Sequence, residues 1–206
     1  MKKKLIFTKI FHFVIVFVIT VMFINCIFCF SCFRFSSELT DYANTQRELL
    51  RIKIYGASSS KEGDTVSGTF SIIDTAGNEI AVIERSWNGS YLAVEFCKIN
   101  LNGNSFVFPT KIYGKQNIIE DNKEWEKGTS LRKYYTENRQ CLLYGFGSTL
   151  HQRKTLYFIS LMSLKKVSVM NSYFTNFYSV DLSECKTNRY YSISCDKNGN
   201  MFVSEI

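Results

Sequence analysis

The hydrophobic pattern begins with a long apolar run near the amino end. Residues 10–33 are 24 residues without a charge, and only His12, Thr20, Asn25 and Ser31 among them are clearly polar. As an α-helix with a rise of about 1.5 Å per residue, this run would be about 36 Å long, enough to cross a hydrocarbon core of about 30 Å. The apolar part of a secretory signal is shorter, about 7–15 residues. We therefore expect residues 10–33 to form a transmembrane signal-anchor helix.

The charges beside this run predict its orientation. Lys2, Lys3, Lys4 and Lys9 precede it, and the first 33 residues contain no acidic side chain. Lysine-rich flanks stay in the cytoplasm, so residues 1–9 are a predicted cytoplasmic flank. Residues 34–206 would then be one extracytoplasmic domain of a single-pass membrane protein. The alternative is a secreted domain, released by signal cleavage near residues 31–37.

The next part of the chain alternates apolar and polar residues in short segments divided by turn residues, which is typical of β-strands. Thr75-Ala76-Gly77-Asn78, Asn88-Gly89 and Asn102-Gly103-Asn104 supply the turns. Strands joined by such short turns favour an antiparallel meander. The five expected strands are residues 51–55, 65–74, 79–87, 91–99 and 105–113.

Two sites predict local features of this meander. Asn88-Gly89 is the strongest hairpin signal in the chain, because a type I′ turn needs positive φ at both positions. We expect Gly89→Val to destabilise the domain by about 1–2 kcal/mol. Pro109 cannot donate to a β-ladder, so its strand should lie at an edge or carry a bulge there.

Helical patterns follow the strands. Residues 114–130 are polar and predict a loop, residues 129–138 a short helix capped by Thr129, and residues 148–166 a second helix capped by Ser148. Three further strands are expected at 177–182, 190–195 and 201–205. The predicted fold class is thus α+β and mainly antiparallel β: a five-stranded meander, one or two helices, and a three-stranded carboxyl-terminal segment.

Net charge adds little to this description. The chain carries +7, of which the four amino-terminal lysines supply four, so the domain itself carries +3. Interspersed charges of this size do not indicate a nucleic-acid partner. The expected partners are the membrane, through residues 10–33, and a protein or glycan.

The seven cysteines divide into three in the apolar run and four in the domain. An exported domain with an even number of cysteines can form two disulfides, with three possible connectivities. A long-range bridge such as Cys141 to Cys195 is favoured over one between Cys185 and Cys195. The candidate disulfide residues are Cys97, Cys141, Cys185 and Cys195.

Candidate catalytic residues are few. His151 is the only histidine after His12, and its polar surroundings indicate a solvated surface residue. No motif for a metal, a nucleotide or another cofactor has the required spacing. Asp74, Glu84 and Glu95 lie in the strand region and leave a carboxylate-based hydrolase open as a hypothesis.

Aromatic content is the most suggestive positive feature. The domain holds all 12 tyrosines and both tryptophans, and aromatic side chains are favoured on recognition surfaces as well as in cores. The candidate recognition residues are Tyr173, Phe174, Phe177 and Tyr178. The leading hypothesis is a non-enzymatic interaction or adhesion module, and the alternative is a sheet curled into a cup around a small molecule.

Overall fold

The structure is a computed structural model that describes residues 2–60, 63–117, 128–168 and 171–206. Its helices and strands follow one another along the chain as α1 (Lys2–Glu38), α2 (Thr40–Ala43), β1 (Arg47–Ser60), β2 (Gly63–Ile73), β3 (Glu79–Asn88), β4 (Tyr91–Leu101), β5 (Asn104–Lys115), β6 (Thr129–Ser130), α3 (Arg132–Tyr135), β7 (Thr136–Glu137), β8 (Gln140–Cys141), η2 (Leu142–Tyr144), α4 (Leu150–Ser160), η3 (Leu161–Ser163), α5 (Lys165–Ser168), β9 (Thr175–Asp181), β10 (Tyr190–Cys195) and β11 (Met201–Glu205).

These elements confirm the α+β, mainly antiparallel fold class, and they distribute the five expected strands over two sheets. The first sheet has the order β11-β10-β1-β2-β3, and the second has the order β6-β5-β4-β9. The predicted carboxyl-terminal strands also divide, because β9 pairs with β4 while β10 pairs with β1 and β11. Each sheet therefore combines strands from both ends of the domain.

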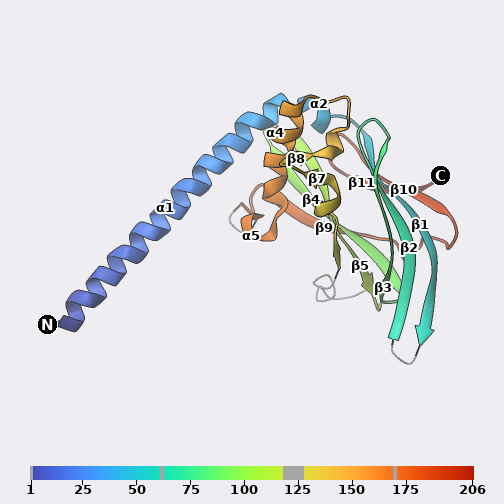
Figure 1. The fold of residues 1–206 in the computed structure, drawn as a ribbon, viewed down its shortest axis with the longest axis horizontal. Coiled ribbons are helices and arrows are strands. Elements are labelled where there is room, and N and C mark those ends of the chain that lie inside the picture. Colours follow the sequence, from blue (N-terminus) through green and yellow to red (C-terminus); the bar gives the residue numbers. More distant parts are fainter. Residues whose placement is uncertain (1, 61–62, 118–127, 169–170) are drawn as a thin grey trace.

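The domain has three layers. In Figure 1, α1, α4 and α5 lie on one side, β4, β5 and β9 lie in the middle, and β1, β2 and β3 lie on the other side. Leu92 to Cys97 of β4 are all buried, as expected for a strand that is covered on both faces. Phe70 from the first sheet and Phe96 and Phe106 from the second belong to one continuous core, which fills the space between the sheets.

The predicted type I′ hairpin at Asn88-Gly89 is wrong. Among the described strands, β3 pairs only with β2, and β4 pairs with β5 and β9, so this connection carries the chain from the first sheet to the second. Gly89 has φ +129°, while Asn88 does not have positive φ. The Gly89 amide donates to the carbonyl of Asp64 at 2.8 Å, and the Ser90 amide donates to Lys115 at 2.8 Å. Asn88-Gly89 therefore does mark a sharp change of chain direction. The pairing of β3 with β2 and of β4 with β5 makes this turn a crossing between sheets and not a hairpin.

The bulge expected near Pro109 is confirmed. Phe96 is paired with Pro109 and Glu95 with Lys111, which leaves Thr110 as the extra residue. The Thr110 hydroxyl donates to the backbone carbonyl of Glu95 at 2.9 Å, and so it holds the bulge in place.

The predicted helices are shorter and begin later than expected. α4 begins after Thr149, not Ser148, because Thr149 and Gln152 form a capping box. The helix expected at 129–138 is reduced to the four residues of α3, and Thr129 lies in β6 instead of capping it. Most of the loop predicted at 114–130, residues 118–127, lies outside the described residues.

The amino-terminal helix α1 has an exposed part and a packed part. Among the described residues, Ile10–Glu38 has the length and composition to cross a membrane, with a mean hydropathy of 2.9 over 18 residues. A signal sequence near the amino end can have the same length and composition. Residues 10–20 are all exposed and project away from the domain (Figure 1). Further along, the rings of Phe28 and Phe35 lie 5.0 and 5.4 Å from that of Phe158 in α4. The end of α1 is therefore part of the domain.

All seven cysteines are free, so the structure lacks the predicted bridge between Cys141 and Cys195. Cys97, Cys141 and Cys195 are buried, and Cys185 is half-buried. Burial raises the pKa of the Cys141 thiol to about 12, from 9.0 for an ordinary thiol. Burial also raises the pKa values of Cys97 and Cys195. In this structure these three side chains are small apolar residues of the core.

Raised thiol pKa values make the fold sensitive to alkali. The folded state favours the neutral thiol, so this contribution to stability is complete below pH 9 and is lost as the pH rises toward 12. At pH 10.5, Cys141 alone should reduce the free energy of unfolding by about 2 kcal/mol. We expect the urea midpoint to fall steeply above pH 9, and Cys141→Ala to make that fall shallower. A Cys141→Ala variant with the same pH dependence as the wild type would contradict the burial of this thiol.

Candidate functional site

The four aromatic candidates do not form one recognition surface. Phe174 packs edge-to-face on Phe33 of α1, with the ring centroids 4.9 Å apart. Tyr178 stacks on Phe96 at 6.0 Å in the core of the second sheet. Phe177, one residue earlier in β9, points to the opposite side of the strand. Of the four, only Tyr173 is largely exposed, with 91% of its surface accessible, and its ring lies edge-to-face with that of Phe174 at 5.3 Å.

The three candidate carboxylates are also separate. Asp74 closes the turn between β2 and β3, where it accepts hydrogen bonds from the amides of Ala76 and Asn78 at 2.9 and 2.8 Å. Glu95 is buried in β4 and bonds to Lys165 at 3.1 Å. Glu84 is exposed on β3, in the other sheet. Each of the first two has a structural partner, and the structure does not bring the three together as a catalytic pair would require.

His151 is exposed, as the sequence predicts, and it has a partner that the sequence did not reveal. Its Nε2 lies 2.9 Å from a carboxylate oxygen of Glu38, at the end of α1, with 72% of the histidine side chain accessible. An exposed pair of this kind contributes little to stability.

We therefore expect His151→Ala to change the free energy of unfolding by less than about 0.5 kcal/mol. Thermal unfolding of the variant at pH 6 and pH 8 measures this. A drop of several degrees at either pH would show that the link between α1 and α4 depends on the pair.

A polar pocket lies where the edges of the two sheets meet. It has a volume of about 460 Å³, within the usual range for ligand sites. The indole of Trp87 forms part of the wall and donates to the hydroxyl of Thr129 at 3.0 Å. Arg85 and Lys133 supply positive charge, and no acidic side chain is among the described residues of the lining. The polar pocket is lined by Arg85, Ser86, Trp87, Asn88, Gly114, Gln116, Gly128, Thr129, Ser130 and Lys133.

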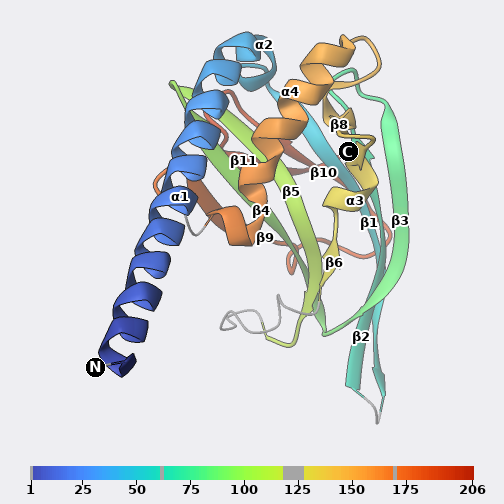
Figure 2. The same cartoon turned by 60° about the vertical axis from the view of Figure 1, so that its left-hand side comes forward.

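An apolar groove of about 340 Å³ lies between α1 and the η3–α5 segment. Figures 1 and 2 both show α5 beside the middle of α1, below α4. The groove is formed by Val21, Ile24, Asn25 and Phe28 of α1, together with Leu161, Leu164 and Val167. Its α1 residues recur at three- and four-residue steps and so share one face of the helix.

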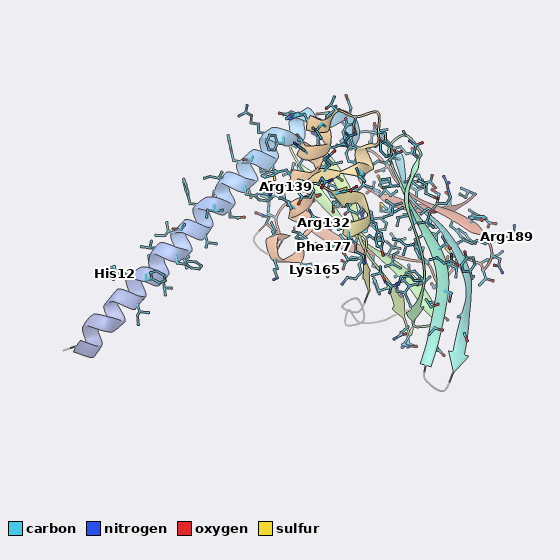
Figure 3. All side chains as sticks on the ribbon, viewed as in Figure 1. His12, Arg132, Arg139, Lys165, Phe177 and Arg189 are labelled. Carbon is cyan, nitrogen blue, oxygen red and sulfur yellow. The ribbon has the colours of Figure 1, made fainter. Side chains whose placement is uncertain are left out.

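Polar contacts hold the walls of the groove in place. Lys165 anchors α5 to the second sheet through Glu95, and its ammonium lies 5.6 Å from the centroid of the Phe177 ring (Figure 3). On the other wall, Asn25 and Asn171 exchange hydrogen bonds at 3.3 Å, and the Cys29 thiol donates to Asn171 at 2.7 Å. The groove therefore belongs to the folded domain as much as to the helix.

Compared with protein-family models, curated proteins and solved structures, the chain matches none of them. The structural features that bear on its function are the polar pocket, the apolar groove and α1. Within the described ranges, no group of three or more His, Cys, Asp or Glu side chains is placed to hold a metal ion.

The sequence predicted neither the polar pocket nor the apolar groove. The polar pocket joins β3 to residues 26 or more positions later, so no local pattern marks it. The apolar groove had a partial signal, because Leu161 and Leu164 both fall within the helix expected at residues 148–166. The actual helix breaks at Leu161, where the hydroxyls of Ser160 and Ser163 donate back to the carbonyls of Tyr157 and Ser160.

Proposed function

We propose that the protein is an uncleaved, single-pass membrane protein whose β-rich domain lies outside the cytoplasm and acts as a non-enzymatic interaction module. One observation carries this proposal: α1 is a single helix whose exposed apolar part runs directly into a packed part of the domain core. Residues 10–28 would span about 29 Å as a helix, close to the hydrocarbon thickness of about 30 Å.

The packed end of α1 argues against signal cleavage. Cleavage near residues 31–37 would separate Cys32, which is buried, and the Phe33 ring from the domain. It would also cut at Ser36, whose backbone carbonyl accepts a hydrogen bond from Asn104. Phe158 and Phe174 would then lose aromatic partners and be exposed to water, at a cost that grows with the apolar area uncovered.

The proposed binding surface for a partner is the polar pocket. Arg85 and Lys133 favour an acidic ligand, and the amide and hydroxyl groups of Asn88, Gln116 and Ser130 suit the hydroxyl groups of a sugar. A glycan that carries carboxylate or sulfate groups combines these features. The separate positions of Asp74, Glu84 and Glu95 favour binding over hydrolysis.

Two measurements test the proposal. A reporter that is active only outside the cytoplasm, fused after Ile206, should be active, whereas an active cytoplasmic reporter would contradict the orientation. Binding of the purified full-length protein to an array of acidic glycans should fall at least tenfold in Arg85→Ala/Lys133→Ala. Lys154→Ala removes an exposed charge from α4 and is the matched control. Equal binding by all three proteins would exclude the pocket.

A further inference from the structure

The apolar groove is an open hydrocarbon surface next to a helix of membrane-spanning length. Leu164 is 41% exposed and Ile24 is 61% exposed, although both face a hollow of about 340 Å³. In water, an open apolar hollow of this kind would be unfavourable, and such surfaces mark places where another apolar group binds.

The position of the groove along α1 indicates which molecules surround the groove. The exposed apolar residues 10–20 lead directly into Val21, Ile24 and Phe28, which form one wall. If the lysine-rich end is cytoplasmic, residues 21–28 lie in the last part of the span, at the depth of the extracytoplasmic leaflet. The molecules that surround residues 10–20 therefore also reach the groove, and these are lipid acyl chains.

The polar residues around the groove are those typical of a membrane–water boundary. The hydrogen-bonded cluster of Asn25, Cys29 and Asn171 lies at the same level of α1. Tyr173, two residues after Asn171, is 91% exposed. Lys166 is exposed on α5 between Leu164 and Val167 of the groove wall. Tyrosine and lysine are enriched at the level of lipid headgroups, where lysine reaches phosphate.

We propose that the groove holds one acyl chain of a phospholipid from the extracytoplasmic leaflet, with the phosphate at the level of Lys166 and Tyr173. The bound chain fills the space between α1 and α5 and seats the domain against the membrane surface. This inference rests on the anchoring of the protein by α1, as proposed above.

Photo-crosslinking of the full-length protein in phosphatidylcholine liposomes tests the inference. The lipid carries a diazirine midway along one acyl chain, and crosslinked peptides are mapped by mass spectrometry. We expect crosslinks to residues 161–167 as well as to α1. Leu164→Asp should reduce the yield on residues 161–167 at least fivefold. The matched control is Phe146→Asp, which changes a ring that is 75% exposed in the loop before α4 and should leave the yield unchanged.

The outcomes separate this inference from the proposed function. A protein that resists carbonate extraction but is crosslinked only on residues 10–20 would overturn the groove and leave the anchor intact. Crosslinks from residues 161–167 to α1 of a second copy would also overturn it, in favour of a dimer. A protein that carbonate extracts from the liposomes would overturn both proposals. Because wild-type mapping already decides the location, the test holds even if Leu164→Asp fails to fold.

Discussion

Replacing Gly89 even with alanine is expected to destabilise the domain by about 3–4 kcal/mol, which is more than the roughly 1–2 kcal/mol expected for Gly89→Val from a strained hairpin turn alone. Gly89 has φ +129°, and a Cβ atom there would lie 2.6 Å from both the backbone nitrogen and the carbonyl oxygen of Lys115. Lys115 ends β5 in the second sheet, while Gly89 follows β3 of the first. The substitution would therefore push the two sheets apart at the point where the chain crosses between them.

Substitutions at two other glycines distinguish the cost of backbone strain from the cost of a steric clash. Gly77 has φ +83° with nothing within 4 Å of the added atom, so Gly77→Ala should cost only about 1–2 kcal/mol. Gly56 has neither positive φ nor a close neighbour, so Gly56→Ala should be close to neutral. Chemical denaturation of the three variants measures the series. If Gly89→Ala and Gly77→Ala had equal effects, the close approach of Gly89 to Lys115 would be wrong.

Removing the two rings of α1 that contact Phe158 is expected to produce the second large effect. Phe28 and Phe35 lie two turns apart on one face of the helix, and both rings contact the Phe158 ring of α4. Phe28→Ala/Phe35→Ala should lower the free energy of unfolding by about 3–5 kcal/mol, because both rings are partly buried and the cavity cannot fully close. Thermal unfolding of the full-length protein in lipid nanodiscs provides the measurement.

Phe30 is the control within the same helix. It lies between the other two in the sequence, but it is 74% exposed and belongs to the opposite face. Phe30→Ala should therefore leave the melting temperature unchanged. If the double variant also melts like the wild type, α1 would be a detachable leader and not part of the domain.

The sequence predicted the strands well because local alternation and turn residues are local properties. Thr75 to Asn78 and Asn102 to Asn104 do close hairpins, between β2 and β3 and between β4 and β5. The pattern could not assign the strands to sheets. Alternation shows that one face of a strand is buried, but it does not identify the strand that lies beside it. Asn88-Gly89 illustrates this limit, since glycine is needed there for a crossing between sheets and not for a hairpin.

The extent of α1 and the state of the cysteines show a second limit. Apolar side chains suit lipid and protein equally, so the composition of residues 10–33 could not reveal that Phe28 packs against α4 while residues 10–20 are exposed. Likewise, an even cysteine count is compatible with bridges or with buried thiols. Cys97 lies in β4 opposite Phe177 and Phe108, where a small apolar side chain fits.

The intact mass of the protein in carbonate-washed membranes of its host decides whether α1 remains attached to the domain, since it reports cleavage and membrane insertion together. We expect the protein in the membrane fraction to retain α1 on the same chain as the domain. A shortened chain that begins near residues 31–37 and is recovered in the soluble fraction would contradict the claim that α1 is both the membrane anchor and part of the folded domain.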